Sequence, residues 1–193
     1  NYIFFGYKII IGNVYGGKVK KFCLSKDIPI ENLSSVKDGK LYDILTKNNI
    51  DLLLLVNCSK KLHQKEIAVP KFGTINIHFG ELPKYRGLMT ILHSIRLKEK
   101  RNGITIHYVN EKLDAGNIID IDYVKISKND NLLSVWKKSS MTGKKMLVKL
   151  IQKIFEENEI KTKVNEDKLS NYFKFPTFNQ ILHYRWTLFK NKF

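Results

Sequence analysis

The sequence predicts an α/β domain with a doubly wound, mostly parallel open sheet and a short C-terminal extension. Residues 51–56 form a continuous apolar run of the kind that is buried on both faces of a parallel sheet. Short strand-like segments alternate with helical ones, which favours right-handed crossovers and an open sheet. A long helical stretch carries an apolar stripe at three- and four-residue spacing, made of Leu147, Leu150, Ile151, Ile154 and Phe155. Such a stripe is typical of a helix that packs across the sheet.

The periodicity of the sequence predicts helices and strands along the chain. The predicted elements before the long helix are a strand at 8–11, helices at 17–24 and 41–45, and strands at 51–56, 73–78, 105–110 and 118–121. A turn containing glycine at 113–116 separates the last two strands. We expect one domain over residues 1–164 and an extension over residues 165–193, in which Thr177 caps a helix that runs through Trp186.

Composition excludes several classes of protein. A chain of 193 residues with 43% hydrophobic content can bury one sizeable core. Cys23 and Cys58 are too few for a disulfide framework or a cysteine metal site. The sequence has neither a dinucleotide fingerprint nor a phosphate loop, and its five histidines have no metal-binding spacing, so we expect no metal. We detect no secretory signal and no apolar run long enough to cross a bilayer, which predicts a cytoplasmic protein.

The net charge of +16 is the strongest competing signal, because lysine-rich stretches attract RNA or phosphorylated substrates. These stretches lie at 18–21, 98–101, 137–149 and 161–163. They are dispersed and are not accompanied by an aromatic and basic stacking motif. Solvated lysine faces are therefore the preferred interpretation, with nucleic-acid binding as the alternative.

Three polar residues form the candidate catalytic set. In the predicted strand 73–78, Asn76 and His78 share one face because side chains two apart point the same way. The strand breaks at Gly80, so both side chains lie near its carboxyl end, where open α/β sheets bind ligands. Asp114 follows in the turn at 113–116. An amide, an imidazole and a carboxylate suffice for proton transfer and oxyanion stabilisation without a metal.

The alternative for Asn-x-His alone is an ordinary half-exposed strand with a hydrogen-bonded histidine. The remaining histidines are interpreted as structural or exposed, namely His63, His93, His107 and His183.

The context of these residues resembles the folate-dependent formyltransferase family. Asn-x-His at 76–78 is followed by Leu-Pro-Lys-Tyr-Arg-Gly at 82–87, by Gly-Ile-Thr-Ile-His at 103–107 and by Leu-Asp-Ala-Gly at 113–116. The 36 positions from His78 to Asp114 also resemble the family spacing. Gly80 and Glu81 depart from the pattern, in which a serine and an apolar residue are common. The resemblance implies a Rossmann-like formyltransferase domain, an Asn76, His78 and Asp114 catalytic set, and 10-formyltetrahydrofolate as formyl donor.

The same resemblance implies a direct transfer. An amine attacks the formyl carbon, Asn76 and protonated His78 stabilise the negative oxygen of the tetrahedral intermediate, and Asp114 orients His78. Asp114 also helps to pass the amine proton to the folate nitrogen.

Candidate binding residues come from the same source. The residues expected at the folate are Val56, Asn57, Cys58, Lys60, Leu62, Asn110 and Leu113. Packing is the alternative for Cys58 and Leu62, and solvent exposure is the alternative for Lys60. Tyr85, Arg86 and Gly87 are expected at the substrate, where Arg86 either contacts a phosphate or braces the loop.

The preferred acceptor is a nucleotide-linked amino sugar. The 82–87 turn and the segment Tyr-Phe-Lys-Phe-Pro-Thr at 172–177 look nearest to sugar N-formyltransferases, and the tail after the long helix is too short for a tRNA-binding domain. The resemblance therefore implies a place in lipopolysaccharide O-antigen biosynthesis. The alternatives are methionyl-tRNA formyltransferase, glycinamide ribonucleotide formyltransferase and a non-catalytic folate- or nucleotide-binding protein. A homodimer could form through aromatic residues of the tail, for which packing on their own domain is the alternative: Phe173, Phe175, Phe178, Tyr184 and Trp186.

The N-terminal segments do not fit the family pattern. Residues 2–7 resemble the family's first strand and turn, and residues 8–14 resemble its second strand. Parallel neighbours need a crossover of about a dozen residues or more, and none is present. We expect that the sequence omits a mobile first helix together with residues before Asn1. A genuine deletion is the alternative, and it would leave the substrate pocket incomplete.

Overall fold

The computed structural model describes residues 2–5, 8–11, 17–31, 39–56, 58, 61–157, 160–166 and 170–190. The chain divides into two compact units, each described by itself. Unit 1 comprises residues 1–77 with 108–112, and unit 2 comprises residues 78–107 with 113–193.

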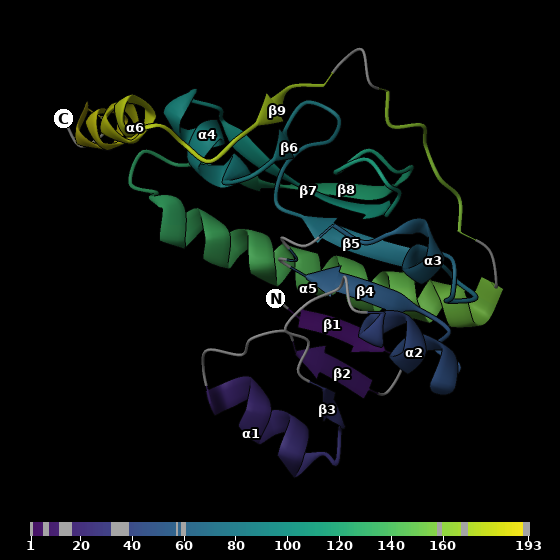
Figure 1. Cartoon of the computed structure of the whole chain (residues 1–193). Coiled ribbons are helices and arrows are strands. Elements are labelled where there is room, and N and C mark those ends of the chain that lie inside the picture. Colours follow the sequence, from purple (N-terminus) through teal and green to yellow (C-terminus); the bar gives the residue numbers. More distant parts are fainter. Residues whose placement is uncertain are drawn as a thin grey trace. The chain divides into compact units, whose positions relative to one another are not determined.

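Unit 1 is built on a sheet whose strands have the order β3-β2-β1-β4-β5 (Figure 1). The strands are β1 (Tyr2–Phe5), β2 (Lys8–Ile11), β3 (Ile30–Glu31), β4 (Leu53–Val56) and β5 (Thr74–His78), whose last residue opens unit 2. The helices are α1 (Gly17–Ser25), α2 (Lys40–Lys47) and α3 (Gln64–Ile67). The predicted helices at 17–24 and 41–45 and the predicted strands at 8–11, 51–56 and 73–78 are therefore confirmed.

The directions of these strands explain the short N-terminal connection. β4 pairs with β5 in parallel, and β2 pairs with β3 in parallel. β1 runs antiparallel to both of its neighbours, β2 and β4. Antiparallel neighbours need only a hairpin, so these two strands need no crossover helix. Among the described strands of unit 1 only β1 is reversed, and the predicted α/β class with a mostly parallel sheet is confirmed.

The core of unit 1 forms where α2 and α3 cover the apolar strand. Leu53 and Leu55 of β4 are buried against Leu41 and Leu45, which lie one helical turn apart on α2. Burying side chains of this size contributes about 2 kcal/mol each. The apolar run at 51–56 is thus a core strand, as its composition predicts.

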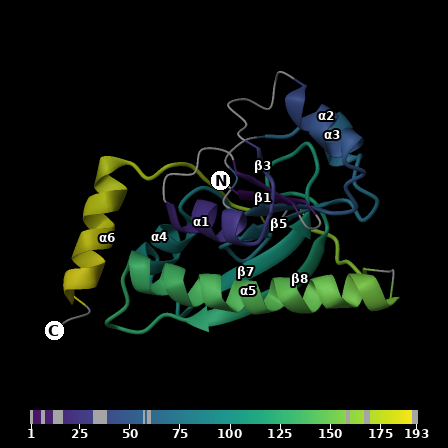
Figure 2. The ribbon, with the colours of Figure 1, turned by 90° about the horizontal axis from the view of Figure 1, so that it is seen from below.

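Unit 2 is built from a hairpin, a long helix and two smaller helices. Its elements are β6 (Arg86–Gly87), α4 (Thr90–Arg96), β7 (Arg101–Tyr108), β8 (Ile118–Lys125), α5 (Leu132–Glu157), β9 (Tyr172–Phe173) and α6 (Phe178–Lys190). β7 and β8 pair antiparallel, and α5 runs along them (Figure 2). The predicted long helix is confirmed.

The hairpin contains a register shift at His107. Ile106 pairs with Asp120, whereas His107 pairs with Ile118, so Ile119 has no partner in the ladder. Such a shift re-aims the side chains around it. His107 and Ile118 are the last pair of the β7–β8 ladder before the loop that carries Asp114.

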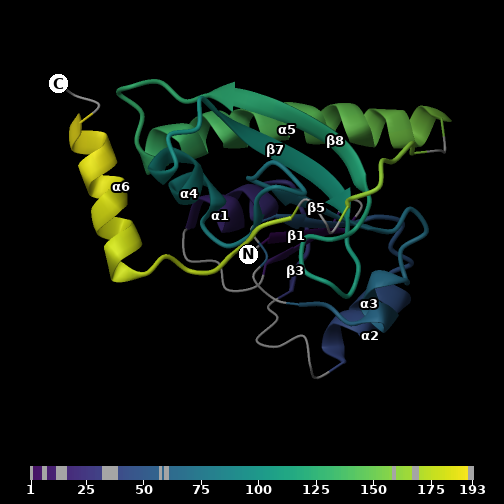
Figure 3. The same ribbon diagram turned by 90° about the horizontal axis from the view of Figure 1, so that it is seen from above.

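Some aromatic residues of the C-terminal segment pack within unit 2, and others are exposed. α6 packs on α4 (Figure 3). Thr177 caps α6, as predicted: its hydroxyl accepts the Gln180 N–H at 3.4 Å, and its own N–H donates to Gln180 Oε1 at 3.0 Å. Phe173 stacks on Tyr85 with ring centroids 5.0 Å apart. Phe175, Phe178 and Trp186 are exposed, so a dimer contact through them stays a prediction.

Among the residues that the structure describes, none belongs to a helix that could span a membrane. The division of the chain at residues 164 and 165 stays a prediction.

Candidate active site

His78 is the last residue of β5 and is buried. Its Nε2 lies 2.6 Å from the carbonyl oxygen of Tyr85. A carbonyl oxygen only accepts hydrogen bonds, so Nε2 carries the hydrogen and donates it. The other ring nitrogen, Nδ1, lies 3.8 Å from Oδ2 of Asp114. The ring is therefore oriented by the backbone on one side and faces a carboxylate on the other.

Asp114 lies in the loop between β7 and β8 and is about as buried as His78. The N–H of Gly87 donates to its Oδ2 at 2.8 Å, which fixes the carboxylate. Its backbone has φ 50, in the left-handed region that few residues except glycine, asparagine and aspartate adopt. Such a conformation persists only where the surroundings hold it. The structure thus confirms that His78 and Asp114, 36 positions apart in sequence, lie together.

His107 is a third member of this cluster. It is 2% exposed, and its Nε2 lies 3.7 Å from Oδ1 of Asp114. Its ring meets the His78 ring edge to face, with centroids 6.4 Å apart. The Asp114 carboxylate therefore lies between two imidazoles. The sequence interpretation left His107 out of the site. His107 shares one face of β7 with Thr105, two positions before it, but nothing in the sequence indicates that this face meets Asp114.

Asn76 precedes His78 by two positions in β5, so the two side chains leave the strand on the same side. Asn76 pairs with Leu55 of β4 and is half-buried. It belongs to unit 1, whereas His78 and Asp114 belong to unit 2.

Gly80 lies directly against the His78 ring, although its departure from the family pattern suggests only a change in loop detail. A Cβ at this position would lie 2.7 Å from His78 Nε2 and 2.7 Å from the Tyr85 carbonyl oxygen. Those two atoms are the partners of the hydrogen bond that orients the ring. Glycine at position 80 is therefore part of how this chain seats its imidazole.

The 82–87 turn is held rigidly by its own side chains. Tyr85 is buried, and its hydroxyl donates to Glu99 Oε1 at 2.8 Å. Burial, together with this carboxylate, raises the pKa of Tyr85 far above its usual value, so the phenol stays neutral. Lys84 donates to the same carboxylate oxygen at 2.7 Å and holds the pKa of Glu99 below its usual range.

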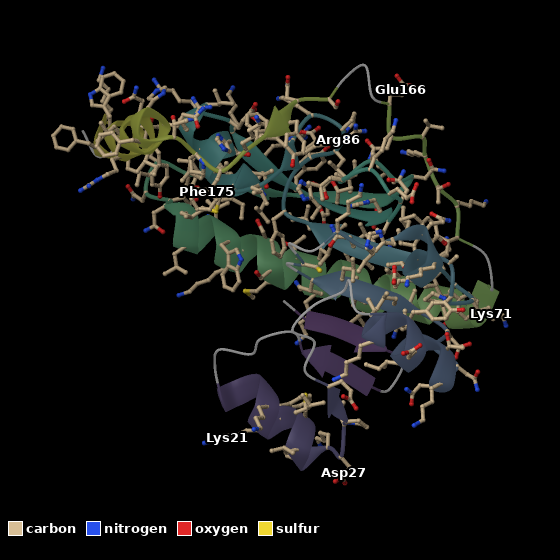
Figure 4. All side chains as sticks on the ribbon, in the orientation of Figure 1. Lys21, Asp27, Lys71, Arg86, Glu166 and Phe175 are labelled. Carbon is tan, nitrogen blue, oxygen red and sulfur yellow. The ribbon has the colours of Figure 1, made fainter. Side chains whose placement is uncertain are left out.

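Arg86, which is labelled in Figure 4, is the first residue of β6 and bonds to Asn165. It is 6% exposed, and its terminal nitrogen donates to Oδ1 of Asn165 at 2.8 Å and to the Asn165 carbonyl at 3.2 Å. Of the two roles weighed for Arg86, these contacts favour the bracing role. Gly87 has φ 96, and a Cβ there would overlap the Phe173 carbonyl oxygen, so only glycine fits beside β9.

The expected folate-binding residues occupy different environments. Leu62 lies in the core of unit 1 and Cys58 packs against that core, as the packing alternative describes. Val56 ends β4, Asn110 accepts the Lys112 N–H in an exposed turn, and Leu113 is exposed. Asn57 and Lys60 lie outside the described residues. Within the described ranges no group of three or more histidine, cysteine or acidic side chains is placed to hold a metal ion.

Comparison with known proteins gives a consistent family. A family model described as formyl transferase matches residues 18–151. A methionyl-tRNA formyltransferase of Fusobacterium nucleatum is 33% identical over 156 residues, which are 81% of this chain and 50% of that protein. This chain spans about half the length of the curated relatives that it matches.

Solved structures give the same fold. A phosphoribosylglycinamide formyltransferase from Bacillus halodurans is 25% identical with a TM-score of 0.69, covering 78% of this chain and 80% of that one. The formyltransferase PseJ from Anoxybacillus kamchatkensis, solved with a UDP-linked formamido sugar and tetrahydrofolate, is 23% identical with a TM-score of 0.69. That match covers 90% of this chain and 88% of that one.

Proposed function

The chain belongs to the formyl transferase family, and from this premise we propose that it moves a formyl group from 10-formyltetrahydrofolate to the amine of a nucleotide-linked amino sugar. The observation that carries the proposal is the buried pair of His78 Nδ1 and Asp114 Oδ2, 3.8 Å apart at the end of β5. A buried imidazole beside a carboxylate is suited to proton transfer and to stabilising developing negative charge.

The reaction requires groups that stabilise a negatively charged oxygen and groups that transfer one proton. The amine nitrogen bonds to the formyl carbon, and the former carbonyl oxygen becomes negative. Asn76 donates its amide hydrogen to that oxygen, and His78 adds a second donor when it is protonated. Removal of one such donor in comparable sites costs about a hundredfold or more in rate.

The bond from the formyl carbon to the folate nitrogen then breaks, and the proton from the amine ends on that nitrogen. Asp114 orients His78 and relays this proton, directly or through water. The distance of 3.8 Å is longer than a hydrogen bond, as is common before a substrate completes a catalytic site.

The co-substrate is assigned by the family. A pterin is flat and rich in donors and acceptors, so backbone groups at strand ends beside an apolar wall suit it. We propose that two segments form the folate site. One is the loop from Val56 to Leu62, which includes Asn57, Cys58 and Lys60, and the other is the turn from Asn110 to Leu113. The reaction needs no metal in this scheme.

Three observations support the sugar acceptor. The 82–87 turn and the 172–177 segment resemble those of sugar N-formyltransferases, and PseJ, whose structure contains a UDP-linked formamido sugar, shares the fold over 90% of this chain. A net charge of +16 also favours attraction of a nucleotide diphosphate. Tyr85, Arg86 and Gly87 form a rigid turn that shapes the substrate side. The homodimer, the cytoplasmic location and the place in O-antigen biosynthesis stay predictions.

Methionyl-tRNA is the second candidate acceptor. The curated relatives that are 33% and 36% identical are methionyl-tRNA formyltransferases, and the basic charge suits RNA. Glycinamide ribonucleotide is the third.

The test is a mass-spectrometric formylation assay of the purified protein with 10-formyltetrahydrofolate. Nucleotide-linked amino sugars are offered as a panel, with methionyl-tRNA and glycinamide ribonucleotide in parallel. We expect one sugar to gain a formyl mass, His78→Ala to lose about a hundredfold or more of the turnover, and His183→Ala, at an exposed histidine of α6, to match the wild type. Formylation of methionyl-tRNA alone would replace the sugar proposal, and near-normal turnover of His78→Ala would reject the catalytic assignment.

A further inference from the structure

A strap follows α5 and is bonded to the loop that carries Asp114. We define the strap as residues 160–166 and 170–173. Lys163 exchanges two backbone hydrogen bonds with Ile118 at the start of β8, at 2.7 and 2.8 Å. At its other end, the carbonyls of Asn171 and Phe173 accept the N–H groups of Arg86 and Leu88, at 3.0 and 2.8 Å. All of these residues belong to unit 2.

Asn165 is the polar side chain that links the strap to the site. It is 6% exposed. Its Nδ2 donates to the carbonyl of Asp114 at 2.9 Å and to the carbonyl of Gly116 at 3.0 Å. Its Oδ1 accepts the Arg86 guanidinium at 2.8 Å. One buried amide thus uses both of its N–H groups and its oxygen on the two segments that meet at the Asp114 carboxylate.

These contacts stabilise the backbone conformation of Asp114. Asp114 has φ 50, in the left-handed region that residues other than glycine adopt only where neighbouring groups hold the backbone. The Asn165 amide bonds the carbonyls on both sides of this residue's turn, and Arg86 bonds the same side chain from the 82–87 turn. Gly87, next to Arg86, donates to the Asp114 carboxylate at 2.8 Å. Asn165 therefore links the backbone of Asp114 to Arg86, whose neighbour Gly87 bonds the Asp114 carboxylate.

We propose that Asn165 is a positioning residue, which holds Asp114 at the distance from His78 that catalysis needs. The proposal rests on the function proposed above but concerns geometry that can be measured without turnover. A displacement of about 1 Å in such a group costs about a hundredfold in rate. Neither the sequence pattern of the family resemblance nor the matched range 18–151 includes position 165.

The first test separates positioning from substrate contact. Asn165→Asp keeps the side-chain volume and the partner for Arg86, but it replaces both N–H donors with an oxygen that faces two carbonyls. We expect kcat to fall tenfold or more while KM for both substrates changes less than threefold. Asn165→Ala should lose at least as much, and Asn165→Gln, which restores an amide, should recover part of the rate. Near-normal kcat in Asn165→Asp would overturn the proposal, because only the Arg86 contact would then matter.

The second test uses the Gly87 amide as a reporter of the Asp114 carboxylate. Its hydrogen exchange should accelerate about tenfold or more in Asn165→Asp, measured by NMR on the full chain. The matched control is Asn171→Ala, at an exposed side chain of the same strap, because the substitution keeps the backbone carbonyl that Arg86 uses. This control should leave both kcat and exchange unchanged. A loss of kcat with unchanged Gly87 exchange would overturn positioning in favour of direct substrate contact.

The two proposals fail in different ways. If the wild type formylates no acceptor, the proposed function fails while the Gly87 exchange still decides whether Asn165 holds Asp114. If the wild type is active and Asn165→Asp changes neither readout, only the positioning role fails.

Discussion

At the residue scale, the site depends on a few atoms whose positions are set by groups that carry no reactive chemistry. The Tyr85 carbonyl fixes the hydrogen on His78 Nε2, and the Gly87 N–H fixes Asp114 Oδ2. Both come from the turn between β5 and α4. Backbone groups of Tyr85 and Gly87 thus position His78 and Asp114. A substitution of the Tyr85 side chain leaves its backbone carbonyl in the chain.

Gly80 offers a sharp test of this arrangement. Gly80→Ser introduces a Cβ 2.7 Å from both partners of the hydrogen bond that orients His78. We expect the ring to shift and kcat to fall about tenfold or more, because catalytic groups tolerate little displacement. Steady-state formylation kinetics with the preferred acceptor measure this loss.

The control for Gly80→Ser is Gly39→Ser, at a glycine with open space around it. Gly39 has φ 78, so the control should cost about 1 kcal/mol of stability and leave kcat unchanged. Wild-type kcat in Gly80→Ser would show that the packing of position 80 does not seat the imidazole.

At the element scale, the start of α5 is fixed by a buried carboxylate. Asp130 is 7% exposed and accepts hydrogen bonds from Lys138 Nζ at 2.6 Å, from the Ser127 N–H at 2.7 Å and from the Ser134 hydroxyl at 2.8 Å. Burial by itself raises the pKa of this carboxyl, but the three hydrogen bonds together lower it below its usual value. α5 packs on the hairpin that carries His107, so its anchoring supports the site.

Asp130→Asn should therefore destabilise the protein in a pH-dependent way. A carboxyl with a lowered pKa in the folded state stabilises the fold above its unfolded pKa, and this contribution is lost as the pH falls through the folded pKa. We expect a loss of about 1 to 2 kcal/mol in the free energy of unfolding at pH 7, which shrinks as the pH falls below the ordinary pKa of an aspartate. Urea titrations at pH 7, 5 and 3 measure it.

Asp122→Asn is the matched control, since Asp122 is exposed on β8. It should change the free energy of unfolding by less than about 0.5 kcal/mol at every pH. A loss in Asp130→Asn that is as large at pH 3 as at pH 7 would contradict an ionic origin.

At the scale of the whole molecule, the excess of basic residues is the dominant property. Lysine and arginine number 34 against 18 aspartate and glutamate residues. Such a field raises the local concentration of anionic substrates and is screened by salt. The strength of this field does not identify the acceptor. The steepness with which kcat/KM falls with salt concentration does.

We expect kcat/KM for a nucleotide-linked amino sugar to fall severalfold between about 50 and 200 mM salt, with kcat unchanged, because few phosphates are involved. A tRNA acceptor would show a fall of about a thousandfold over this range. Initial-rate measurements at fixed pH distinguish the two. The same substrate in matched concentrations of sucrose is the control, and a salt effect on kcat itself would argue against electrostatic attraction as its cause.

Local patterns in the sequence predicted several helices and strands and the candidate catalytic set. The apolar run at 51–56, the helices at 17–24 and 41–45 and the cap at Thr177 followed from composition and period, because burial and hydrogen-bond satisfaction act locally along the chain. Asn76, His78 and Asp114 could be proposed because strand alternation and a glycine-containing turn are local signals, and the family resemblance suggested their chemistry.

The surroundings of these residues come from contacts between segments that are far apart in the sequence. His107 lies at a register shift of the hairpin and 3.7 Å from Asp114, Gly80 lies against the His78 ring, and the Asn165 side chain bonds the Asp114 loop from 51 positions away. The reversed direction of β1 likewise depends on pairing with β4, which is distant in sequence. These features arise from contacts between remote segments, and no local periodicity or propensity encodes such contacts.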